Sequence, residues 1–293
     1  MGGPTALRQA LASERLLVAP VCYDALTARL VETLGFKVAY LGGFALGATT
    51  CISEPLTTMA EMAAQARGIA RRIRIPLVVD GDAGWGEPLH TMRAVHEFEW
   101  AGVAGIHIED QHYPKRAHYH KGLEHIVSTD EMQMKIRAAV QAREDKGFVL
   151  IARTDAMRTH GFAEGIARGN AYADAGADLV MCFPNTVEEA RRAPGEIHAP
   201  VVYVNSQGNR LGRPLFSTDE LQDMGWKLLI EAITAPLVAV QAIKRAYADL
   251  ARTGRMALDP GEMRAIRKEI EDLVGLEEHY RVEAATVEPG TPE

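Results

Sequence analysis

Acidic side chains end two apolar runs of the sequence and could together bind a hard metal ion. Asp80 and Asp82 stand in VVDGDAGWG, and Glu109 stands in GIHIED. Residues two apart on a strand point the same way, and the glycines let backbone approach a ligand closely. Oxygen ligands with room for water suit Mg²⁺, or Mn²⁺, better than zinc. The same spacing also allows three separately solvated or salt-bridged carboxylates.

Arg153 follows another apolar run, FVLIA, and has two interpretations. It could form a structural salt bridge with Glu109 or Asp155. It could also hold a substrate carboxylate or an enolate oxygen, because a guanidinium matches a carboxylate and stabilises developing negative charge. The residue alone does not separate the two.

A long polar loop, residues 111–129, follows the run that ends in Glu109. It is rich in basic and aromatic side chains: Lys115, Arg116, His118, Tyr119, His120 and Lys121. A long loop at such a place is typically a lid over a site, although a solvated surface loop is the alternative. With Arg153, the residues Lys115, His118, Tyr119 and His120 are the catalytic candidates.

Eight apolar runs must position these residues. They span 16–24, 38–43, 75–82, 104–110, 148–155, 179–184, 201–205 and 227–232, with amphipathic segments between them. Helix-like stretches end at Gly35, Gly102, Gly176 and Gly225, as expected where a left-handed residue closes a helix. Thr58, Thr129 and Thr218 are candidate N-caps. Strand then helix, eight times, predicts a (β/α)₈ TIM barrel; a doubly wound sheet would need fewer strands and a glycine-rich dinucleotide turn.

The repeat stops near residue 255, which divides the chain into three predicted parts. Residues 1–255 form the catalytic barrel, residues 256–286 an α-helical C-terminal extension, and residues 287–293 a disordered tail. The extra helices could cover the barrel bottom or pack on a neighbouring subunit.

Composition limits the classes of function. The net charge is −7, and no basic stripe predicts nucleic-acid binding. No run reaches the roughly 18 apolar residues of a membrane span. Three cysteines without a zinc or disulfide pattern, and an N-terminus without a signal-peptide core, predict a cytoplasmic protein. A small anionic substrate remains compatible with this charge.

Taken together, the motifs resemble the isocitrate lyase/phosphoenolpyruvate mutase superfamily over about residues 5–285. The motifs that carry the resemblance are YLGG, VVDGDAGWG, GIHIEDQ, PKR, IARTDA and VVYVNSQGNRLGRPLFSTDEL. The resemblance implies a barrel with an exchanged C-terminal helix, assembled as a dimer of dimers (a homotetramer). It also implies Mg²⁺ held by Asp82, with Asp80 and Glu109 acting largely through waters.

The resemblance further implies where a small carboxylate substrate binds. Its 2-oxo-acid end chelates the metal, its carboxylate meets backbone amides near Gly42 and Gly43, and Arg153 stabilises the oxyanion. The substrate-binding candidates are Tyr40, Gly42, Gly43, Asp80, Arg153, Asn185, Asn205 and Ser206.

The sequence departs from the family at the leaving-group half of the site. Lyases such as methylisocitrate lyase carry an acid/base cysteine in the loop where this chain has Ala117. Their acidic residue after strand six appears here as Asn185, and the one after strand two has only Ser53 or Glu54 nearby. His118, Tyr119 or His120 could supply the missing proton.

The resulting prediction is a Mg²⁺-dependent carbon–carbon lyase for a small 2-hydroxy or 2-oxo di- or tricarboxylate. It would act by retro-aldol cleavage or decarboxylation through an enolate. Two alternatives remain: phosphonopyruvate-type mutase or hydrolase chemistry, and an inactive metabolite-binding homologue.

Overall fold

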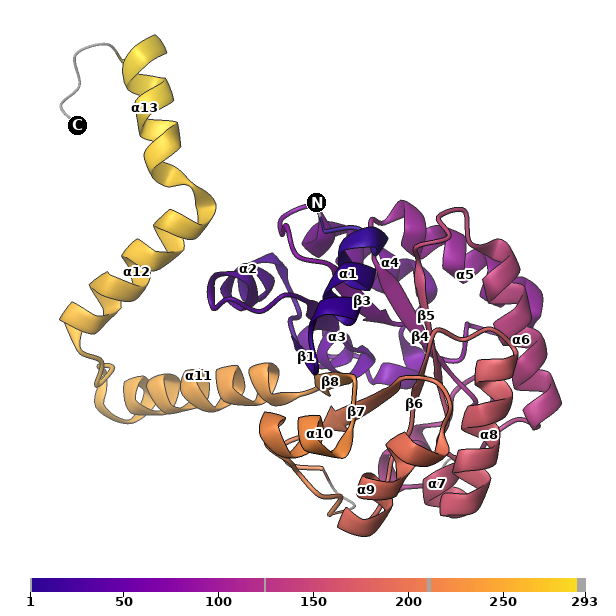
Figure 1. Cartoon of the computed structure of the whole chain (residues 1–293). Helices are drawn as coiled ribbons and strands as arrows, with labels where there is room; N and C mark the ends of the chain where they lie inside the picture. The colour runs from indigo at the N-terminus through magenta and orange to yellow at the C-terminus, as the bar shows by residue number, and fades with distance from the viewer. Residues whose placement is uncertain (1, 124, 210–211, 289–293) are drawn as a thin grey trace. The chain divides into compact units, whose positions relative to one another are not determined.

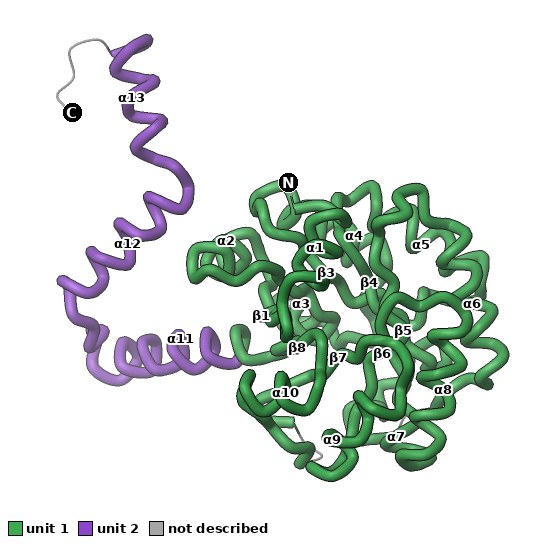
Figure 2. The backbone as a smooth tube through the Cα atoms, viewed as in Figure 1, with its two compact units in different colours: residues 1–236 green, residues 237–293 purple. Residues whose placement is uncertain are grey.

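Eight parallel strands form a barrel in the first of the two compact units of this chain, residues 1–236 (Figures 1 and 2). The computed structural model describes residues 2–123, 125–209 and 212–288. The strands are β1 (Leu17–Pro20), β2 (Ala39–Leu41), β3 (Leu77–Asp80), β4 (Gly105–Glu109), β5 (Val149–Arg153), β6 (Leu179–Met181), β7 (Val201–Asn205) and β8 (Leu228–Glu231). Each lies inside one of the eight predicted runs, so the predicted TIM barrel is confirmed.

The strands pair in the order β1-β8-β7-β6-β5-β4-β3-β2, which nearly closes the barrel. The seam of the barrel lies between β1 and β2, the two ends of this order. On the other side of β1, Leu17 pairs with Leu228 of β8. Between β1 and β2 a single bridge joins Val21 to Tyr40, supported by a 2.7 Å hydrogen bond from Cys22 N to Tyr40 O.

Helices follow the strands and cover the outside of the barrel (Figure 1). They are α1 (Pro4–Ser13), α2 (Ala25–Thr33), α3 (Gly43–Thr50), α4 (Met59–Ala70), α5 (Pro88–Trp100), α6 (Thr129–Ala142), α7 (Ala156–Thr159), α8 (Phe162–Asp174), α9 (Val187–Glu196) and α10 (Thr218–Met224). Two short 3₁₀ turns, η1 (Glu54–Leu56) and η2 (Ala117–Lys121), lie in loops.

Helix ends follow the sequence closely but not at every residue. Gly35, Gly102, Gly176 and Gly225 all have positive φ, as predicted. Thr58 caps α4, where its hydroxyl accepts from Glu61 N. The other two predicted caps are wrong by one position: Ser128 caps α6 and Ser217 caps α10, because the serine hydroxyl reaches the N–H three residues on.

Successive residues of each strand point alternately into the barrel and outward to the helices. Side chains such as Val78, Ile151 and Ile230 are fully or almost fully buried in the interior cluster. Their strand neighbours, such as Val79 and Leu150, pack outward against the helices. This period of two leaves the residues at the C-terminal ends of the strands free to line a site.

The second compact unit is residues 237–293, and its described part is mainly helical. It contains α12 (Pro260–Val274), α13 (Leu276–Thr286) and nearly all of α11 (Thr234–Thr253). Large apolar side chains along these helices are exposed: Val238, Ile243, Tyr247, Leu250, Ile266, Ile270, Val274, Tyr280 and Val282. The compact units divide after Pro236, ahead of the predicted boundary at residue 255, and the predicted tail lies outside the described residues from position 289 on.

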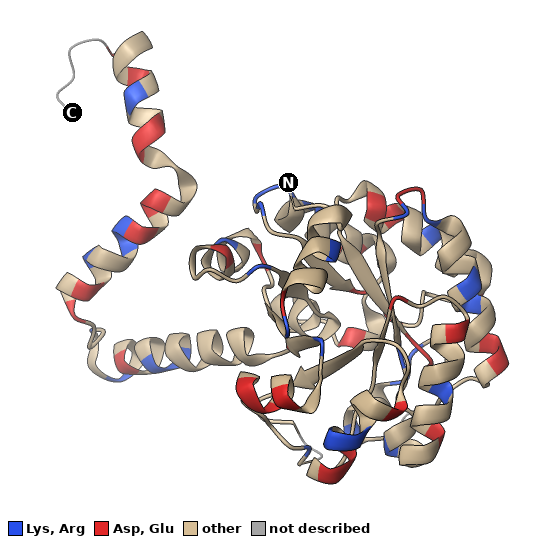
Figure 3. Ribbon diagram, in the orientation of Figure 1, with Lys and Arg blue, Asp and Glu red and all other residues tan. Residues whose placement is uncertain are grey.

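Charged side chains of both signs are interspersed on the outer helices (Figure 3). Ion pairs one helical turn apart, such as Arg192–Glu196 at 2.8 Å, account for part of this pattern. None of the helices in the described part of the chain combines the length and apolar character that crossing a membrane requires.

Candidate active site

A cavity of about 150 Å³ lies at the C-terminal ends of the strands. Predicted site residues that line it are Tyr40, Gly42, Gly43, Asp80, Tyr119, Arg153 and Ser206. Other lining residues were not predicted as site residues: Phe44, Glu54, His107, Arg158, Met181, Phe183, Val204, Arg213, Ala232 and Ile233. The barrel thus gathers residues from most of its loops at one place.

Asp80 is held at the edge of the cavity by backbone donors. Its Oδ2 accepts from Gly43 N at 3.0 Å, and its Oδ1 accepts from Asp82 N at 2.9 Å. Burial alone would raise the pKa of Asp80, but His107, Lys115 and Arg153 together lower it to about 2. Asp80 is therefore a fixed negative charge at neutral pH.

Lys115, from the long loop, places its ammonium group among three carboxylates. Its Nζ lies 2.7 Å from Glu54 Oε1, 2.9 Å from Glu109 Oε1 and 3.7 Å from Asp82 Oδ2. Its side chain is fully buried, as is that of Glu109. Asp82 and Glu109, two of the three carboxylates predicted to converge, therefore lie with Glu54 in one acidic group that has a positive charge at its centre.

Arg153 lies beside this acidic group. Its Nη1 is 2.8 Å from Glu109 Oε2, and its Nη2 is 3.1 Å from Asp155 Oδ2. Burial raises the pKa of Glu109 to about 8, against the lowering effect of Arg153 and Lys115. Arg153 forms both predicted salt bridges and also lines the cavity, so its role in holding a substrate stays a prediction.

The acidic group has the donor chemistry of a Mg²⁺ site. Among the described residues, no three acidic, histidine or cysteine side chains converge as a complete ligand set. Mg²⁺, however, commonly keeps several waters and takes only one or two protein carboxylates. Asp82 and Glu109, which lie around a lysine ammonium group, and Asp80 at the cavity are oxygen donors of the kind that such an ion takes, so these three residues could hold it.

Two glycines allow helix α3 to begin against the cavity. A Cβ on Gly43 would lie 2.9 Å from Glu54 Cγ and 3.1 Å from Asp80 Oδ2, and one on Gly42 would lie 2.9 Å from the Tyr40 ring. The first N–H groups of a helix lack intrahelical acceptors and attract anions. The Tyr40 hydroxyl forms a 2.9 Å hydrogen bond with His107 Nε2, which holds the Tyr40 ring in place.

The long loop brings one of its three proton-donor candidates to the cavity. The Tyr119 hydroxyl donates to Glu54 Oε2, and the ring lies 4.3 Å from Lys115 Nζ. His120 packs on the Tyr119 ring, with centroids 4.1 Å apart, and does not line the cavity. His118 and Ala117 are exposed.

Of the remaining predicted residues, one lines the cavity and two hydrogen-bond to backbone carbonyl groups near it. Ser206 lines the cavity, whereas the buried Asn205 donates to Phe216 O at 2.8 Å and anchors the segment before α10. Asn185 donates to Met157 O at 2.9 Å and is not among the lining residues. Met181, the last residue of β6, and Phe183, two residues beyond it, line the cavity instead.

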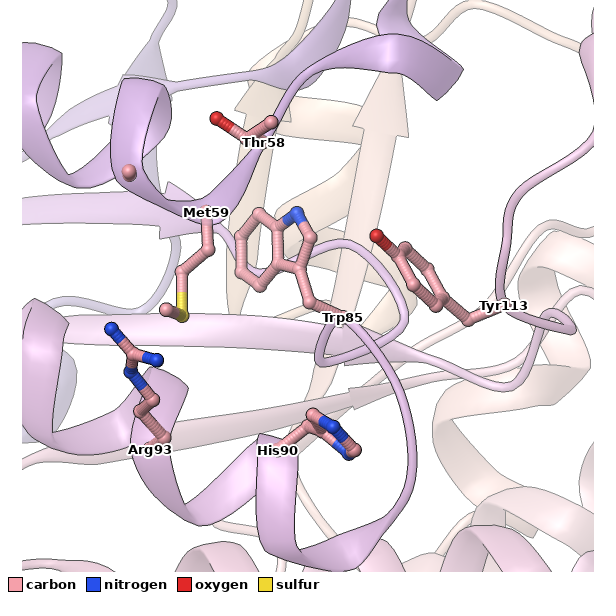
Figure 4. Close-up of a pocket in the computed structure, with 7 residues that line it drawn as sticks. Thr58, Met59, Trp85, His90, Arg93 and Tyr113 are labelled. Atoms are coloured by element: carbon pink, nitrogen blue, oxygen red, sulfur yellow. The ribbon is translucent and has the colours of Figure 1, made fainter.

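A separate hollow of about 280 Å³ lies beside the start of the long loop (Figure 4). Its walls include Met59, Trp85, His90, Arg93 and Tyr113. Trp85, at φ 52°, donates its ring N–H to Thr57 O at 3.3 Å. This hollow has no lining residue in common with the barrel-mouth cavity.

Comparison with known proteins places this geometry in a family context. The family model for phosphoenolpyruvate phosphomutase matches residues 7–251. The 2,3-dimethylmalate lyase of Eubacterium barkeri is 36% identical over 281 residues, covering 94% of this chain and 96% of that protein. A probable 2-methylisocitrate lyase of Corynebacterium glutamicum is 37% identical over 254 residues, covering 85% and 81%.

Solved structures agree with the sequence relatives. A crystal structure of 2,3-dimethylmalate lyase has a TM-score of 0.89 at 32% identity, covering 100% of this chain and 99% of that one. Oxaloacetate acetylhydrolase with 3,3-difluorooxalacetate gives 0.89 at 30% identity, covering 99% of each chain. Phosphonopyruvate hydrolase with oxalate and Mg²⁺ gives 0.85 at 31% identity, covering 98% and 100%.

Proposed function

This chain belongs to the phosphoenolpyruvate phosphomutase family and is a carbon–carbon lyase of the isocitrate lyase/phosphoenolpyruvate mutase superfamily, and we propose that its reaction requires Mg²⁺. Its substrate is a small 2-hydroxy or 2-oxo di- or tricarboxylate, cleaved by a retro-aldol step or by decarboxylation. The observation that carries this proposal is that Asp80 and Arg153 line one small cavity, with Arg153 paired behind it to the buried Glu109 at 2.8 Å.

Asp82 would hold the ion directly, with Asp80 and Glu109 acting through waters. Bound Mg²⁺ supplies Lewis-acid polarisation of the substrate's 2-oxygen. The oxalate and Mg²⁺ present in the structure of the related phosphonopyruvate hydrolase support this choice of ion.

Residues of the chain itself perform the remaining tasks. The N-terminus of α3 at Gly42 and Gly43 binds the carboxylate next to the reacting carbon. The Arg153 guanidinium, held by Glu109 and Asp155, stabilises the negative charge that develops on oxygen as the carbon–carbon bond breaks.

Tyr119 takes the acid role that Ala117 cannot perform. Burial and the neighbouring Glu54 keep its pKa well above the usual value, so the hydroxyl is protonated at neutral pH. In a retro-aldol cleavage this proton passes to the leaving carbon. Glu54, which lines the cavity and accepts the Tyr119 hydrogen bond, takes the proton of the substrate's 2-hydroxyl and returns it to Tyr119. In a decarboxylation, carbon dioxide leaves without a proton. Lys115, on the same loop, holds the loop against Glu54 and Glu109.

The test is chelator-sensitive release of pyruvate or glyoxylate by the purified full-length protein. The panel contains oxaloacetate, substituted malates and isocitrates, each with Mg²⁺ and with EDTA. Arg153→Lys should abolish turnover, whereas Arg93→Lys, an exposed arginine on α5, should leave it unchanged. Independently of turnover, Mg²⁺ should raise the melting temperature, because a ligand that binds only the folded state stabilises it. No release from any substrate, with Mg²⁺ bound, would refute the lyase proposal.

Phosphonopyruvate chemistry is the second candidate, since phosphonopyruvate hydrolase is among the similar structures. Appearance of inorganic phosphate in ³¹P NMR of the enzyme with phosphonopyruvate would favour it. An inactive metabolite-binding homologue would bind substrates in the presence of Mg²⁺ without turning over any of the panel.

We also propose that the protein is a cytoplasmic homotetramer, a dimer of dimers, in which the helices of residues 237–288 are exchanged between subunits. The exposed apolar side chains on α11, α12 and α13 support this, because a surface of this kind marks an interface. Ile270→Glu should reduce the mass measured by light scattering, whereas Glu269→Gln, its neighbour on α12, should not. An unchanged mass for Ile270→Glu would contradict the proposed interface.

A further inference from the structure

Three arginine side chains surround one phenylalanine ring on the β5–β7 side of the cavity. The Cζ atoms of Arg153, Arg158 and Arg213 lie 4.8, 4.5 and 4.8 Å from the ring centroid of Phe183. All four residues line the cavity. Stacking on an aromatic face fixes a guanidinium while its N–H groups remain able to donate in the plane.

One of these three arginines, Arg213, has no carboxylate partner among the described residues. Asp155 is shared, at 3.1 Å from Arg153 and 2.7 Å from Arg158. Arg213 is only 7% exposed, and its Nη1 donates to Val204 O at 3.4 Å. Within the described residues, no carboxylate pairs with Arg213. Burial, with repulsion from Arg158 and Arg153, lowers the pKa of Arg213 to about 10, which still leaves it charged at neutral pH.

A buried cation without an anionic partner destabilises a protein unless something else compensates its charge. Phe183 and one backbone carbonyl offer only partial compensation. An anionic ligand in the cavity would complete it, because a guanidinium binds a carboxylate through paired hydrogen bonds.

The cavity is electrically divided between two sides of the barrel. Asp80 and Glu109 end β3 and β4, and Glu54 follows β2. Arg158 and Arg213 follow β5 and β7, which come after β4 when the pairing order is read from β2. A ligand that reaches from one side to the other therefore meets the acidic group at one end and two arginines at the other.

We propose that Arg158 and Arg213, stacked on Phe183, form a second carboxylate subsite that binds the distal acid group of the substrate. The cavity of about 150 Å³ is smaller than the roughly 300–1,000 Å³ of drug-sized ligand sites. The substrate is therefore a short diacid, of the size of malate, and not a tricarboxylate. The inference rests on the proposed function, because the reacting end is assigned to the acidic side.

Calorimetry on the full-length protein with saturating Mg²⁺ tests this with matched probes. Malate and 2-hydroxybutyrate have the same chain length, and only malate has the distal carboxylate. We expect malate to bind roughly 10- to 100-fold more tightly, as a charge-assisted hydrogen-bonded pair implies, and isocitrate to bind more weakly than malate. Arg213→Gln should remove the preference for malate, Arg213→Lys should keep part of it, and the exposed Arg93→Gln should keep all of it.

Oxalate separates failure of this inference from failure of the proposed function, since both of its carboxylates fit the reacting end. If the wild-type protein does not bind oxalate in the presence of Mg²⁺, the proposed function is overturned. Normal oxalate binding with equal affinity for malate and 2-hydroxybutyrate would overturn the subsite alone.

Thermal melting supplies a readout that a purely structural arginine would not give. Without ligand, Arg213→Gln should melt at the same or a higher temperature, because it removes an uncompensated buried charge. A clear fall in melting temperature, with the malate preference intact, would assign Arg213 to the fold and refute the proposal.

Discussion

The ammonium group of Lys115 and the carboxyl group of Glu109 are in direct contact and fully buried, with 2.9 Å between Nζ and Oε1. Lys115 comes from the long loop 111–129, and Glu109 is the last residue of β4. The contact therefore joins a loop to the acidic group that is proposed to bind Mg²⁺. The Lys115 ammonium group and the proposed Mg²⁺ ion would therefore bind the same carboxylates.

Replacing Lys115 should make the stability of the folded protein depend on bound Mg²⁺. Lys115→Met leaves Glu54 and Glu109 without their ammonium partner, a change that typically costs about 3–5 kcal/mol in a buried pair. We expect a lower melting temperature in EDTA, recovery when Mg²⁺ is added, and tighter Mg²⁺ binding by calorimetry. Lys121→Met, on the exposed part of the same loop, is the control. Equal Mg²⁺ affinity in wild type and Lys115→Met would contradict the shared-carboxylate arrangement.

Binding of Mg²⁺ should release protons near neutral pH. The pKa of Glu109 is raised to about 8 in the folded protein, so the group is largely protonated at pH 7 and must ionise to bind the cation. Affinity should rise by up to about tenfold per pH unit below pH 8 and then level off. Calorimetry in buffers with different ionisation heats measures the protons released, and Glu109→Gln should release none from this group.

The same raised pKa predicts how stability depends on pH in the absence of metal. An unfolded glutamate titrates near 4.3, roughly, so between that pH and about 8 the folded chain binds the extra proton. Stability without metal should therefore fall as the pH rises through this range. Denaturant titrations at pH 5.5 and 7.5 should show the difference, and it should be absent in Glu109→Gln.

Tyr119→Phe removes the proposed proton donor with little change in shape. If the reaction is a retro-aldol cleavage, kcat should fall by roughly 10²- to 10⁴-fold while KM changes little. His118→Ala, which alters the exposed residue immediately before Tyr119, should leave kcat near the wild-type value. A decarboxylase would retain activity in Tyr119→Phe, so the variant also separates the two proposed reactions.

Gly43→Ala raises helix propensity but introduces a steric clash. Alanine is favoured over glycine in a helix by about 1 kcal/mol, yet its Cβ would press on Glu54 and Asp80 at 2.9 and 3.1 Å. We expect a loss of kcat/KM without a large change in melting temperature. Gly68→Ala, inside α4 with nothing within 4 Å of the new Cβ, should raise the melting temperature and leave activity unchanged. Full activity in Gly43→Ala would show that this contact is not needed.

The barrel and its acidic wall could be predicted from local patterns. Apolar runs that end in Asp80, Glu109 and Arg153 fix the strand ends, and parallel strands bring those ends to one mouth. Glu54 and Arg213 were not predicted as site residues, because each lies in a loop whose path depends on tertiary packing. Asn185 was predicted at the site, but β6 ends at Met181, so that Met181 and Phe183 line the cavity while Asn185 bonds to Met157 O. Loop residues carry no periodic signal that reveals the direction of their side chains.

The seam of the barrel has a consequence for its dynamics. One bridge, Val21 with Tyr40, joins β1 to β2, whereas β4 and β5 share five residue pairs. Tyr40 also lines the cavity. The amide of Cys22, bonded to Tyr40 O across that seam, should therefore exchange its hydrogen faster than the β4–β5 amides. It should slow when a ligand occupies the cavity, so one amide proton would report both the opening of the barrel wall and the occupancy of the site.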